Sequence, residues 1–320
     1  MLLRPWSSLF TELHPTGDSM DFTRNFQRLM HLPRRIIREA ITLTQLVRLS
    51  LINRYGWSQV TNPGGPVVSL TTYGKRSKTV YIAIESIANG AVRPSRLILW
   101  VDDAVLFDNL PLTLRRLQKR GLEVKLCKNY GPHTKYYPYV ESQSSFDVPL
   151  VTADDDMLYA SYWLKKLIEA NREYPEIVNC YWAYVVPLNE NGIEKYVGWE
   201  RCNSTIASFC NVAMGAAGAV YPPPFLMVLK RAGTAFENCC PKGDDHWLHA
   251  QAIRSGYKVR QILPQWSYFS FQSIPGTQQT ALCHENVDRG NGEGNRQAMI
   301  ATYTESDIQL LRADCGLESQ

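Results

Sequence analysis

Residues 148–159 read VPLVTADDDMLY, and this stretch decides how the whole chain is interpreted. The short apolar run at 148–153 is typical of a buried strand, and it ends in three consecutive carboxylates, Asp154, Asp155 and Asp156. Adjacent carboxylates repel one another, so a strand that ends in three of them favours a bound cation. The alternative is an acidic turn that caps the next helix, because Asp is frequent at helix starts.

The sequence on either side of the triplet favours the cation. Short apolar runs at 67–72, 96–101 and 123–127 predict strands, and helical patterns near 80–88 and 111–117 lie between them. This alternation predicts an α/β fold with a mostly parallel sheet flanked by helices. Because such sheets bind ligands at the carboxyl ends of their strands, the triplet is placed where Mg²⁺ or Mn²⁺ could be held.

Composition and charge exclude several classes of protein. The chain has 320 residues, of which 45% are hydrophobic, so it can bury a large core and is not disordered as a whole. The net charge of +4 is too small to indicate a nucleic-acid partner. The first 60 residues hold eight Arg, no Lys and four acids, so the entire positive excess lies there.

The N-terminal region contains a predicted amphipathic helix at residues 33–54, with several Arg and a broad apolar face. Its Arg residues are too many for a membrane span, which leaves two interpretations open: peripheral contact with an anionic membrane surface, or packing on the rest of the protein or a second subunit. We expect a helical extension at 1–60, a catalytic domain at 61–275 and a C-terminal lid or tail at 276–320.

The eight cysteines form no CxxC pair, and no compact secretory signal opens the chain. We therefore expect reduced thiols and a cytoplasmic location. If the helix binds a membrane, the protein would lie at its inner face. A zinc site of Cys239, Cys240, His246 and His249 is disfavoured by its spacing, and buried structural thiols are preferred.

Several segments resemble, in the same order, GT-A glycosyltransferases of the family 2 type, especially bacterial enzymes that build cell-surface polysaccharides. The resemblance covers residues 66–300 and rests on six segments: VVSLTTYGKR at 67–76, RLILWV at 96–101, HTKYYPYV at 133–140, VTADDDMLY at 151–159, GAAGAVYPP at 215–223 and CPKGDDHWL at 240–248. It implies a Rossmann-like GT-A fold and transfer of a sugar from a nucleoside-diphosphate sugar, with a UDP-sugar favoured, to a glycan or lipid-linked acceptor.

The resemblance also implies roles for individual residues on the donor side. Thr71, Thr72 and Tyr73 would contact the base and ribose, and Arg76 and Lys135 would approach the diphosphate. Asp154 would lie near the ribose and Asp156 would be the main metal ligand, with Asp155 between them. One of His246, His249 and His284 could add a metal ligand. We expect His284 to take that role, together with Asp156 and Asp154. Each of these histidines is, alternatively, an ordinary core or surface residue.

On the acceptor side, Asp245, with Asp244 as second choice, resembles the carboxylate that acts as general base in inverting enzymes. Helix capping by these acids is the alternative, because they follow Gly243 at a predicted helix start. Gly215 and Gly218 could let the backbone approach a sugar on which Trp199 and Tyr221 stack, whereas tight core packing is the ordinary explanation for such residues.

Two other functions fit parts of the pattern. A metal-dependent phosphoester hydrolase also uses carboxylates at strand ends, but it predicts an acid after the first strand, where this chain has Thr71, Thr72 and Tyr73. A non-catalytic glycan-binding protein that retains the GT-A fold is the second alternative. No nucleic-acid partner is expected, and a homo-oligomer is compatible with the sequence.

Overall fold

The computed structural model describes residues 37–190, 192–194, 199–266, 271–280 and 293–316. Contacts divide the chain into two units, Met1–Arg48 and Leu49–Gln320. The described part of the first unit, residues 37–48, is helical, and the helix continues to residue 55. Within the described residues, no helix combines the length and hydrophobicity needed to cross a bilayer. The domain limits expected near 60 and 275 stay predictions.

The larger unit is built on a seven-stranded sheet with the strand order β13-β6-β12-β4-β1-β2-β3. All neighbours are parallel except β12, which runs antiparallel to both β4 and β6. The predicted α/β fold with a mostly parallel sheet is thus confirmed. The strands are β1 Val67–Thr71, β2 Arg96–Val101, β3 Leu122–Leu126, β4 Leu150–Thr152, β6 Val178–Cys180, β12 Ala219–Tyr221 and β13 Val259–Gln261.

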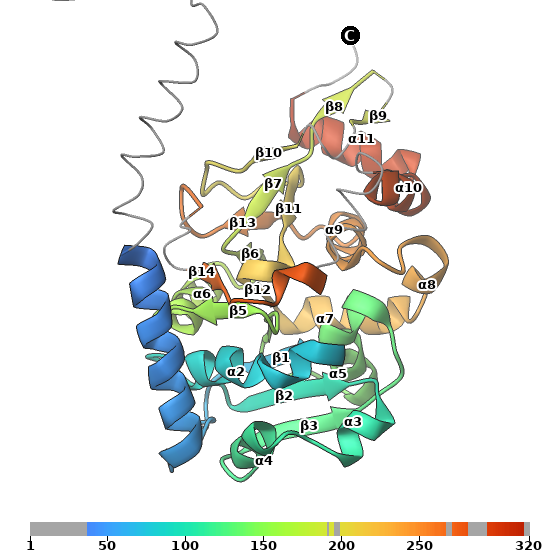
Figure 1. The fold of residues 1–320 in the computed structure, drawn as a ribbon. Helices are drawn as coiled ribbons and strands as arrows, with labels where there is room; N and C mark the ends of the chain where they lie inside the picture. The colour runs from blue at the N-terminus through green and yellow to red at the C-terminus, as the bar shows by residue number, and fades with distance from the viewer. Residues whose placement is uncertain (1–36, 191, 195–198, 267–270, 281–292, 317–320) are drawn as a thin grey trace, which may run out of the picture. The chain divides into compact units, whose positions relative to one another are not determined.

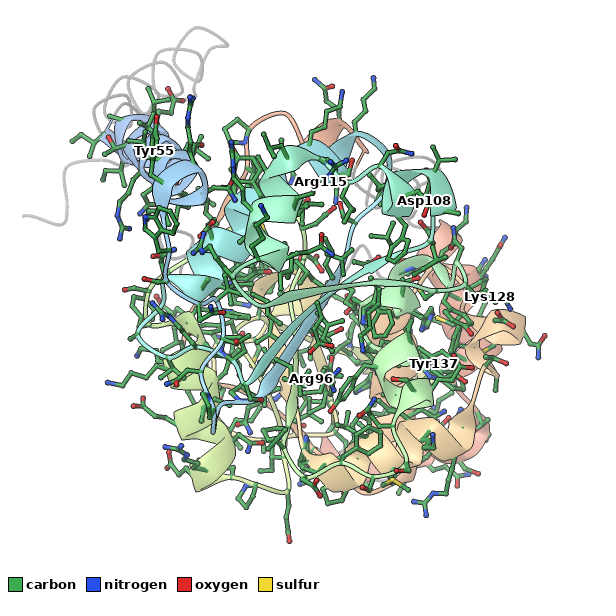
Figure 2. The ribbon with its side chains drawn as sticks, turned by 90° about the horizontal axis from the view of Figure 1, so that it is seen from below. Tyr55, Arg96, Asp108, Arg115, Lys128 and Tyr137 are labelled. Atoms are coloured by element: carbon green, nitrogen blue, oxygen red, sulfur yellow. A yellow bond between two sulfur atoms is a disulfide. The ribbon has the colours of Figure 1, made fainter. Side chains whose placement is uncertain are left out.

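Helices cover both faces of this sheet, because strand residues buried on two sides need apolar partners on each. Figure 2 shows α4, which carries Arg115, on one side of the strands and α5, which begins at Tyr137, on the other. One buried cluster joins strand residues such as Val67 and Leu150 to α5, α7 and α9. The helices are α2 Val80–Ala88, α3 Ala104–Asp108, α4 Leu112–Gln118, α5 Tyr137–Ser142, α6 Trp163–Glu173, α7 Pro223–Ala232, α8 Phe236–Cys239, α9 Asp244–Arg254, α10 Glu293–Thr302 and α11 Glu305–Asp314.

Smaller sheets extend this core. Residues 178–185 form two strands, because the chain turns at Tyr181 and Trp182 and leaves the main sheet. The second of them forms a three-stranded sheet, and another pair joins the segment after the acidic triplet to residues 271–273. These strands are β5 Met157–Tyr159, β7 Ala183–Val185, β8 Leu188–Asn189, β9 Gly192–Ile193, β10 Glu200–Arg201, β11 Asn211–Ala213 and β14 Phe271–Ser273.

The C-terminal helices α10 and α11 pack against α9 (Figure 1). Asp307 caps α11 and accepts hydrogen bonds from Arg254 of α9, and Asp314 at the end of α11 accepts from Ser208 and from the backbone of Phe209. A disulfide joins Cys210 to Cys315. The expectation that all thiols are reduced is wrong for this pair, because the fold brings together two cysteines that are 105 residues apart.

Gly218 illustrates how closely the elements pack before β12. Its φ of +97° lies in a region that other residues avoid, and a Cβ there would come within 2.6 Å of the Trp163 ring. The Trp163 indole in turn donates to the carbonyl of Ala217 at 2.8 Å. The glycine is therefore required by the contact between the start of α6 and the turn that leads into β12.

We predict that Gly218→Ala lowers the free energy of unfolding by about 2–4 kcal/mol, because it combines backbone strain with a clash against a fixed ring. Gly256→Ala is the matched control. Its φ is +79°, but a Cβ there meets nothing within 4 Å. This control should lose only the backbone cost of about 1–2 kcal/mol. Urea unfolding measures both, and equal losses would contradict the role given to the Trp163 contact.

Candidate functional site

The acidic triplet lies at the point where the order of the strands reverses. From β1 the chain builds outward through β2 and β3, and it then returns to form β4 on the other side of β1. Because β1 and β4 are parallel neighbours, Thr72 and Asp154, which follow them, lie at the same edge of the sheet. Such a reversal point, at the carboxyl ends of the strands, is where open α/β sheets bind ligands.

One polar cluster at this edge surrounds Asp155 and Asp156. The Thr72 hydroxyl donates to Asp155 at 2.7 Å, and Arg76 bridges the two acids, with N–O distances of 2.9 Å to Asp155 and 3.1 Å to Asp156. The Gln278 amide donates to Asp156 at 3.0 Å. Asp155 thus has its charge neutralised inside the protein, 4% exposed, and serves to hold the loop after β4 against the loop after β1.

A second cluster is centred on Lys135, which is 8% exposed. Its ammonium lies 2.9 Å from Asp154 and 3.1 Å from Asp244. Asp245, partly exposed beside them, accepts a hydrogen bond of 3.0 Å from the backbone N–H of Gly215. The triplet and the acids at the start of α9 are ninety residues apart in sequence. They meet across one lysine.

Backbone contacts fix the position of both clusters. The Ser69 hydroxyl of β1 donates to the carbonyl of Lys135 at 2.7 Å, and the backbone N–H of Asp154 donates to the Tyr159 hydroxyl at 2.7 Å. The backbone N–H of Ile274, just after β14, donates to the carbonyl of Asp156 at 2.7 Å. The site is consequently assembled from β1, β4, β5, β14 and α9 together.

The site carries more negative than positive charge. Five carboxylates, those of residues 154–156, 244 and 245, face two cationic side chains, Arg76 and Lys135. Burial opposes the charge on Lys135, but Asp154, Asp244 and Asp245 outweigh it and raise its pKa well above the ordinary value. Burial, together with repulsion from Asp154, raises the pKa of Asp156 to about 6. Burial and repulsion from Asp244 raise the pKa of Asp245 to about 8.

Among the described residues, protein side chains alone do not form a metal centre. No group of three or more His, Cys, Asp or Glu side chains among them is arranged to hold an ion. A divalent ion bound together with a nucleotide needs less, because one or two carboxylates and the phosphates complete its coordination. Asp154 Oδ2 and Asp156 Oδ1 fit this description, since neither accepts a hydrogen bond from a described residue. The residues present therefore fit Mg²⁺ or Mn²⁺ carried in with a diphosphate.

The predicted donor-side residues do not all face the open edge. Thr72 is fully buried and bonded to Asp155, so its expected contact with the base and ribose is wrong: it positions the acidic loop instead. Thr71 donates to the carbonyl of Trp100 at 3.2 Å. Tyr73 is 41% exposed, and the Arg76 guanidinium lies over its ring at 5.4 Å. Of the three, Tyr73 offers the most accessible surface to a nucleobase.

The aromatic residues expected to stack on a sugar lie in the core. Trp199 is 7% exposed within a cluster that also holds Val212 and Met299, and Tyr221 is 3% exposed in the core beneath the sheet. A sugar could stack on neither ring without displacing core side chains, and Gly218 is occupied by its contact with Trp163. The ordinary interpretation, tight packing, describes all three residues.

The histidines divide in the same way. His249 uses both ring nitrogens in the interior, at 2.7 Å from the Tyr303 hydroxyl and 2.7 Å from the carbonyl of Phe209, and burial lowers its pKa to about 4. Burial lowers the pKa of His246 to about 3, and its ring meets Trp199 edge to face. His284 lies outside the described residues.

Sequence reasoning missed Gln278 and Tyr159 as parts of the site, and it gave Gly215 a contact with the sugar instead of its contact with Asp245. Gly215 packs so closely that a Cβ would lie 2.9 Å from the Lys135 ammonium. Tyr159 falls within a segment already singled out for its resemblance, so its neighbourhood was a usable signal. Gln278 lies in a Gly-, Gln- and Asn-rich stretch that gave no such signal.

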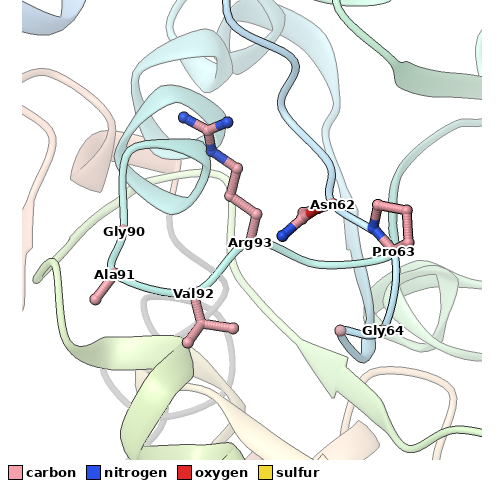
Figure 3. Close-up of a pocket in the computed structure, with 8 residues that line it drawn as sticks. Asn62, Pro63, Gly64, Gly90, Ala91, Val92 and Arg93 are labelled. Atoms are coloured by element: carbon pink, nitrogen blue, oxygen red, sulfur yellow. The ribbon is translucent and has the colours of Figure 1, made fainter.

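A cavity of about 440 Å³ lies elsewhere in the larger unit, lined by residues 62–65 and 90–93 (Figure 3). These segments precede β1 and β2, so the cavity is at the amino-terminal edge of the sheet, opposite the acidic residues. Its size alone does not make it the reaction site, because none of the paired charges described above lines it.

No protein-family model and no curated protein matches the chain. Among solved structures, it is similar to a mannosyltransferase from Pyrobaculum calidifontis in complex with GDP-Man and Mn2+. The two share 12% identity and a TM-score of 0.49, over 90% of this chain and 81% of that one. GalNAc-T7 with UDP, GalNAc and Mn2+ shares 13% identity and a TM-score of 0.42, over 61% of this chain and 41% of that one.

A third structure, CMP:2-keto-3-deoxy-manno-octonic acid synthetase complexed with CTP, shares 11% identity and a TM-score of 0.38, over 61% of this chain and 88% of that one. With TM-scores below 0.5 at such identities, none of these likenesses assigns a family, an activity or a metal to this chain.

The raised pKa of Asp245 predicts a pH dependence of stability. The folded protein keeps a proton on Asp245 that the unfolded chain releases above the ordinary value of 3.8, so stability falls as pH rises toward about 8. Asp245→Asn removes this effect. In chelating buffer, its melting temperature should exceed that of the unmodified protein increasingly from pH 5 to pH 8.

Asp108→Asn, at an exposed carboxylate on α3 (Figure 2), is the control and should follow the unmodified protein. Parallel curves for Asp245→Asn and the unmodified chain would show that Asp245 is not destabilised by burial and by Asp244.

Proposed function

We propose that the protein is a metal-dependent glycosyltransferase of the GT-A type, which moves a sugar from a nucleoside-diphosphate sugar to a glycan or lipid-linked acceptor. The observation that carries the proposal is the pair of acidic groups that meet across Lys135. One group follows a strand at the reversal point of the sheet and the other begins α9. Two such groups suit a reaction in which a leaving group and a nucleophile need separate treatment.

On the donor side, Asp156 and Asp154 would hold Mg²⁺ or Mn²⁺ against the diphosphate. Such an ion offsets the negative charge that builds on the departing nucleoside diphosphate without transferring a proton. Arg76 and Lys135 already counter the carboxylates, and their charges suit them to approach the phosphates. Tyr73 would stack on the base, with Thr71 close to the ribose, and a UDP-sugar is the favoured donor.

On the acceptor side, Asp245 would take the proton from the attacking hydroxyl, with Asp244 held to Lys135 beside it. The raised pKa of about 8 makes the ionised carboxylate a stronger base than an ordinary Asp, and the ionised fraction that acts as the base grows as pH rises toward that value. Attack on the face opposite the leaving group makes the proposed reaction inverting. The Gly215 N–H, which donates to Asp245, would keep the carboxylate aligned.

The rival enzymatic function is less well supported. A phosphoester hydrolase would use an acid at the end of β1, and the fully buried Thr72 stands there instead, bonded to Asp155. The alternative of a glycan-binding protein without activity does not require an acid at the end of β1. Turnover of a nucleotide sugar would distinguish the transferase from it. We also propose a cytoplasmic location, a role in polysaccharide synthesis and a homo-oligomer.

The first prediction from this function concerns the metal. Asp156→Asn should abolish the Mn²⁺-dependent binding of UDP, because it removes the charge of the main ligand, while the melting temperature without ligand stays close to that of the unmodified chain. Isothermal titration calorimetry with and without Mn²⁺ measures the effect, and Asp108→Asn provides a carboxylate change away from the site. Unaltered affinity in the Asp156 variant would remove the metal assignment.

The second concerns the base. Asp245→Asn should bind UDP and Mn²⁺ normally but release UDP from a UDP-sugar, in the presence of candidate glycans, about 10²–10⁴ times more slowly. The physical reason is that the amide cannot accept the proton of the acceptor hydroxyl. Retained transfer would place the base elsewhere or indicate a retaining reaction.

A further inference from the structure

The helix at residues 37–55 presents an apolar face to solvent. The sequence pattern left open whether this face packs on the protein or contacts a membrane. In the described part of the first unit, four large apolar side chains of this helix are between 49% and 63% exposed: Ile37, Ile41, Leu43 and Val47. In the larger unit, Leu51 and Tyr55 of the same helix are 52% and 62% exposed. Leu49 and Asn53, on the opposite side of the same helix, are buried at 3% and 2%. We call the exposed set the outer face.

The inward side is well fixed in the larger unit. Asn53 donates hydrogen bonds of 3.1 Å to Glu85 and to the carbonyl of Thr113, and the hydroxyl of Ser50 lies 2.9 Å from that of Tyr81. The rotation of residues 49–55 about the helix axis is therefore determined, and Leu51 and Tyr55 point away from the core. Solvent-exposed apolar stripes of this length are uncommon in proteins that have no partner for them.

Positive charge accompanies the outer face. At 100° per residue, Arg48 falls between Ile37 and Ile41, and Arg54 falls between Leu43 and Val47 near the edge of the face. Both are exposed, and Glu39 is the only acid between residues 37 and 57. Long Arg side chains can lay their apolar stems along such a face and keep the guanidinium at its border.

Exposed aromatic residues stand at the end of the helix. The Arg54 guanidinium lies over the Tyr55 ring at 5.3 Å, and Trp57, two residues after the helix, is 92% exposed. Tyr and Trp favour the boundary between lipid headgroups and acyl chains, where one part of the ring is apolar and another hydrogen-bonds. A fully exposed Trp next to an apolar, Arg-bearing helix face fits that boundary better than it fits water.

We propose that the outer face is a docking surface for an anionic lipid bilayer, on which residues 37–57 lie in the plane of the headgroups. The combination of apolar, cationic and aromatic side chains matches the helices that lie on membranes rather than cross them. A second copy of this chain is a poorer occupant, because pairing two outer faces would enclose Arg48 and Arg54 of both copies in an apolar interface, and the outer face contains no acid to neutralise them. The surface shares no residue with the proposed transfer site.

The test uses the full chain and sedimentation with sucrose-loaded vesicles of 70% phosphatidylcholine and 30% phosphatidylglycerol, compared with pure phosphatidylcholine. The unmodified protein should sediment with the anionic vesicles and bind the neutral ones more weakly. Leu51→Glu should weaken binding at least tenfold, since it removes an inserted side chain and adds a repelled charge. Gln45→Glu, an exposed position beside the outer face, adds the same charge alone and should weaken binding by no more than about fivefold.

Arg48→Gln separates the electrostatic part. It should weaken binding to the anionic vesicles about fivefold and leave binding to neutral vesicles unchanged. All three substitutions are at exposed positions, so melting temperatures should stay within a few degrees of the unmodified chain. Asp156→Asn should sediment like the unmodified protein even though it is expected to lose UDP binding, so the two proposals can fail independently.

Three outcomes would overturn the proposal. The first is failure of the unmodified chain to sediment with anionic vesicles. The second is equal binding by Leu51→Glu and Gln45→Glu, which would make the apolar face irrelevant. The third is light scattering that shows a dimer, without lipid, which Leu51→Glu turns into a monomer: the outer face would then be an interface between copies.

Discussion

The contact of Lys135 with Asp154 and Asp244 is the interaction on which the arrangement of the site depends. A buried ammonium is costly unless carboxylates surround it, and carboxylates this close to one another are costly unless a cation separates them. Each therefore requires the other. Because Asp154 follows a strand of the sheet and Asp244 begins α9, the ion pairs fix the helix to the reversal point of the sheet.

Other contacts serve the same arrangement. Ser69 and Tyr159 hold the backbones of Lys135 and Asp154, and Arg76 with Thr72 keeps Asp155 buried. Behind α9, the helices α10 and α11 provide packing that a single helix on the sheet would lack. The charged residues at the edge are thus held by an apolar and hydrogen-bonded frame, so that a ligand need not organise them on arrival.

Much of the fold follows from local pattern. The apolar run before Asp154 could only be a buried strand, and alternation of such runs with helical stripes made a parallel sheet the natural result. The position of the triplet at a strand end followed directly. What local pattern could not provide is the partner of each side chain: Thr72 meets Asp155 across 83 residues and Gln278 meets Asp156 across 122. The same limit hid the Cys210–Cys315 pairing, and it made Trp199 and Tyr221 look like sugar platforms although their rings fill the core.

The disulfide has a topological consequence. It closes a covalent ring from Cys210 to Cys315, and this ring contains Gly215, both acids of α9 and Gln278, whereas Lys135 and the acidic triplet lie outside it. The acids of α9 thus lie inside the disulfide-closed ring, and Lys135 and the triplet lie in the chain before it. A single peptide-bond cleavage anywhere within residues 211–314 would leave the acids of α9 attached to the protein through one arm of the ring, whereas a cleavage between 160 and 209 would separate the two halves and leave noncovalent contacts alone to hold them together.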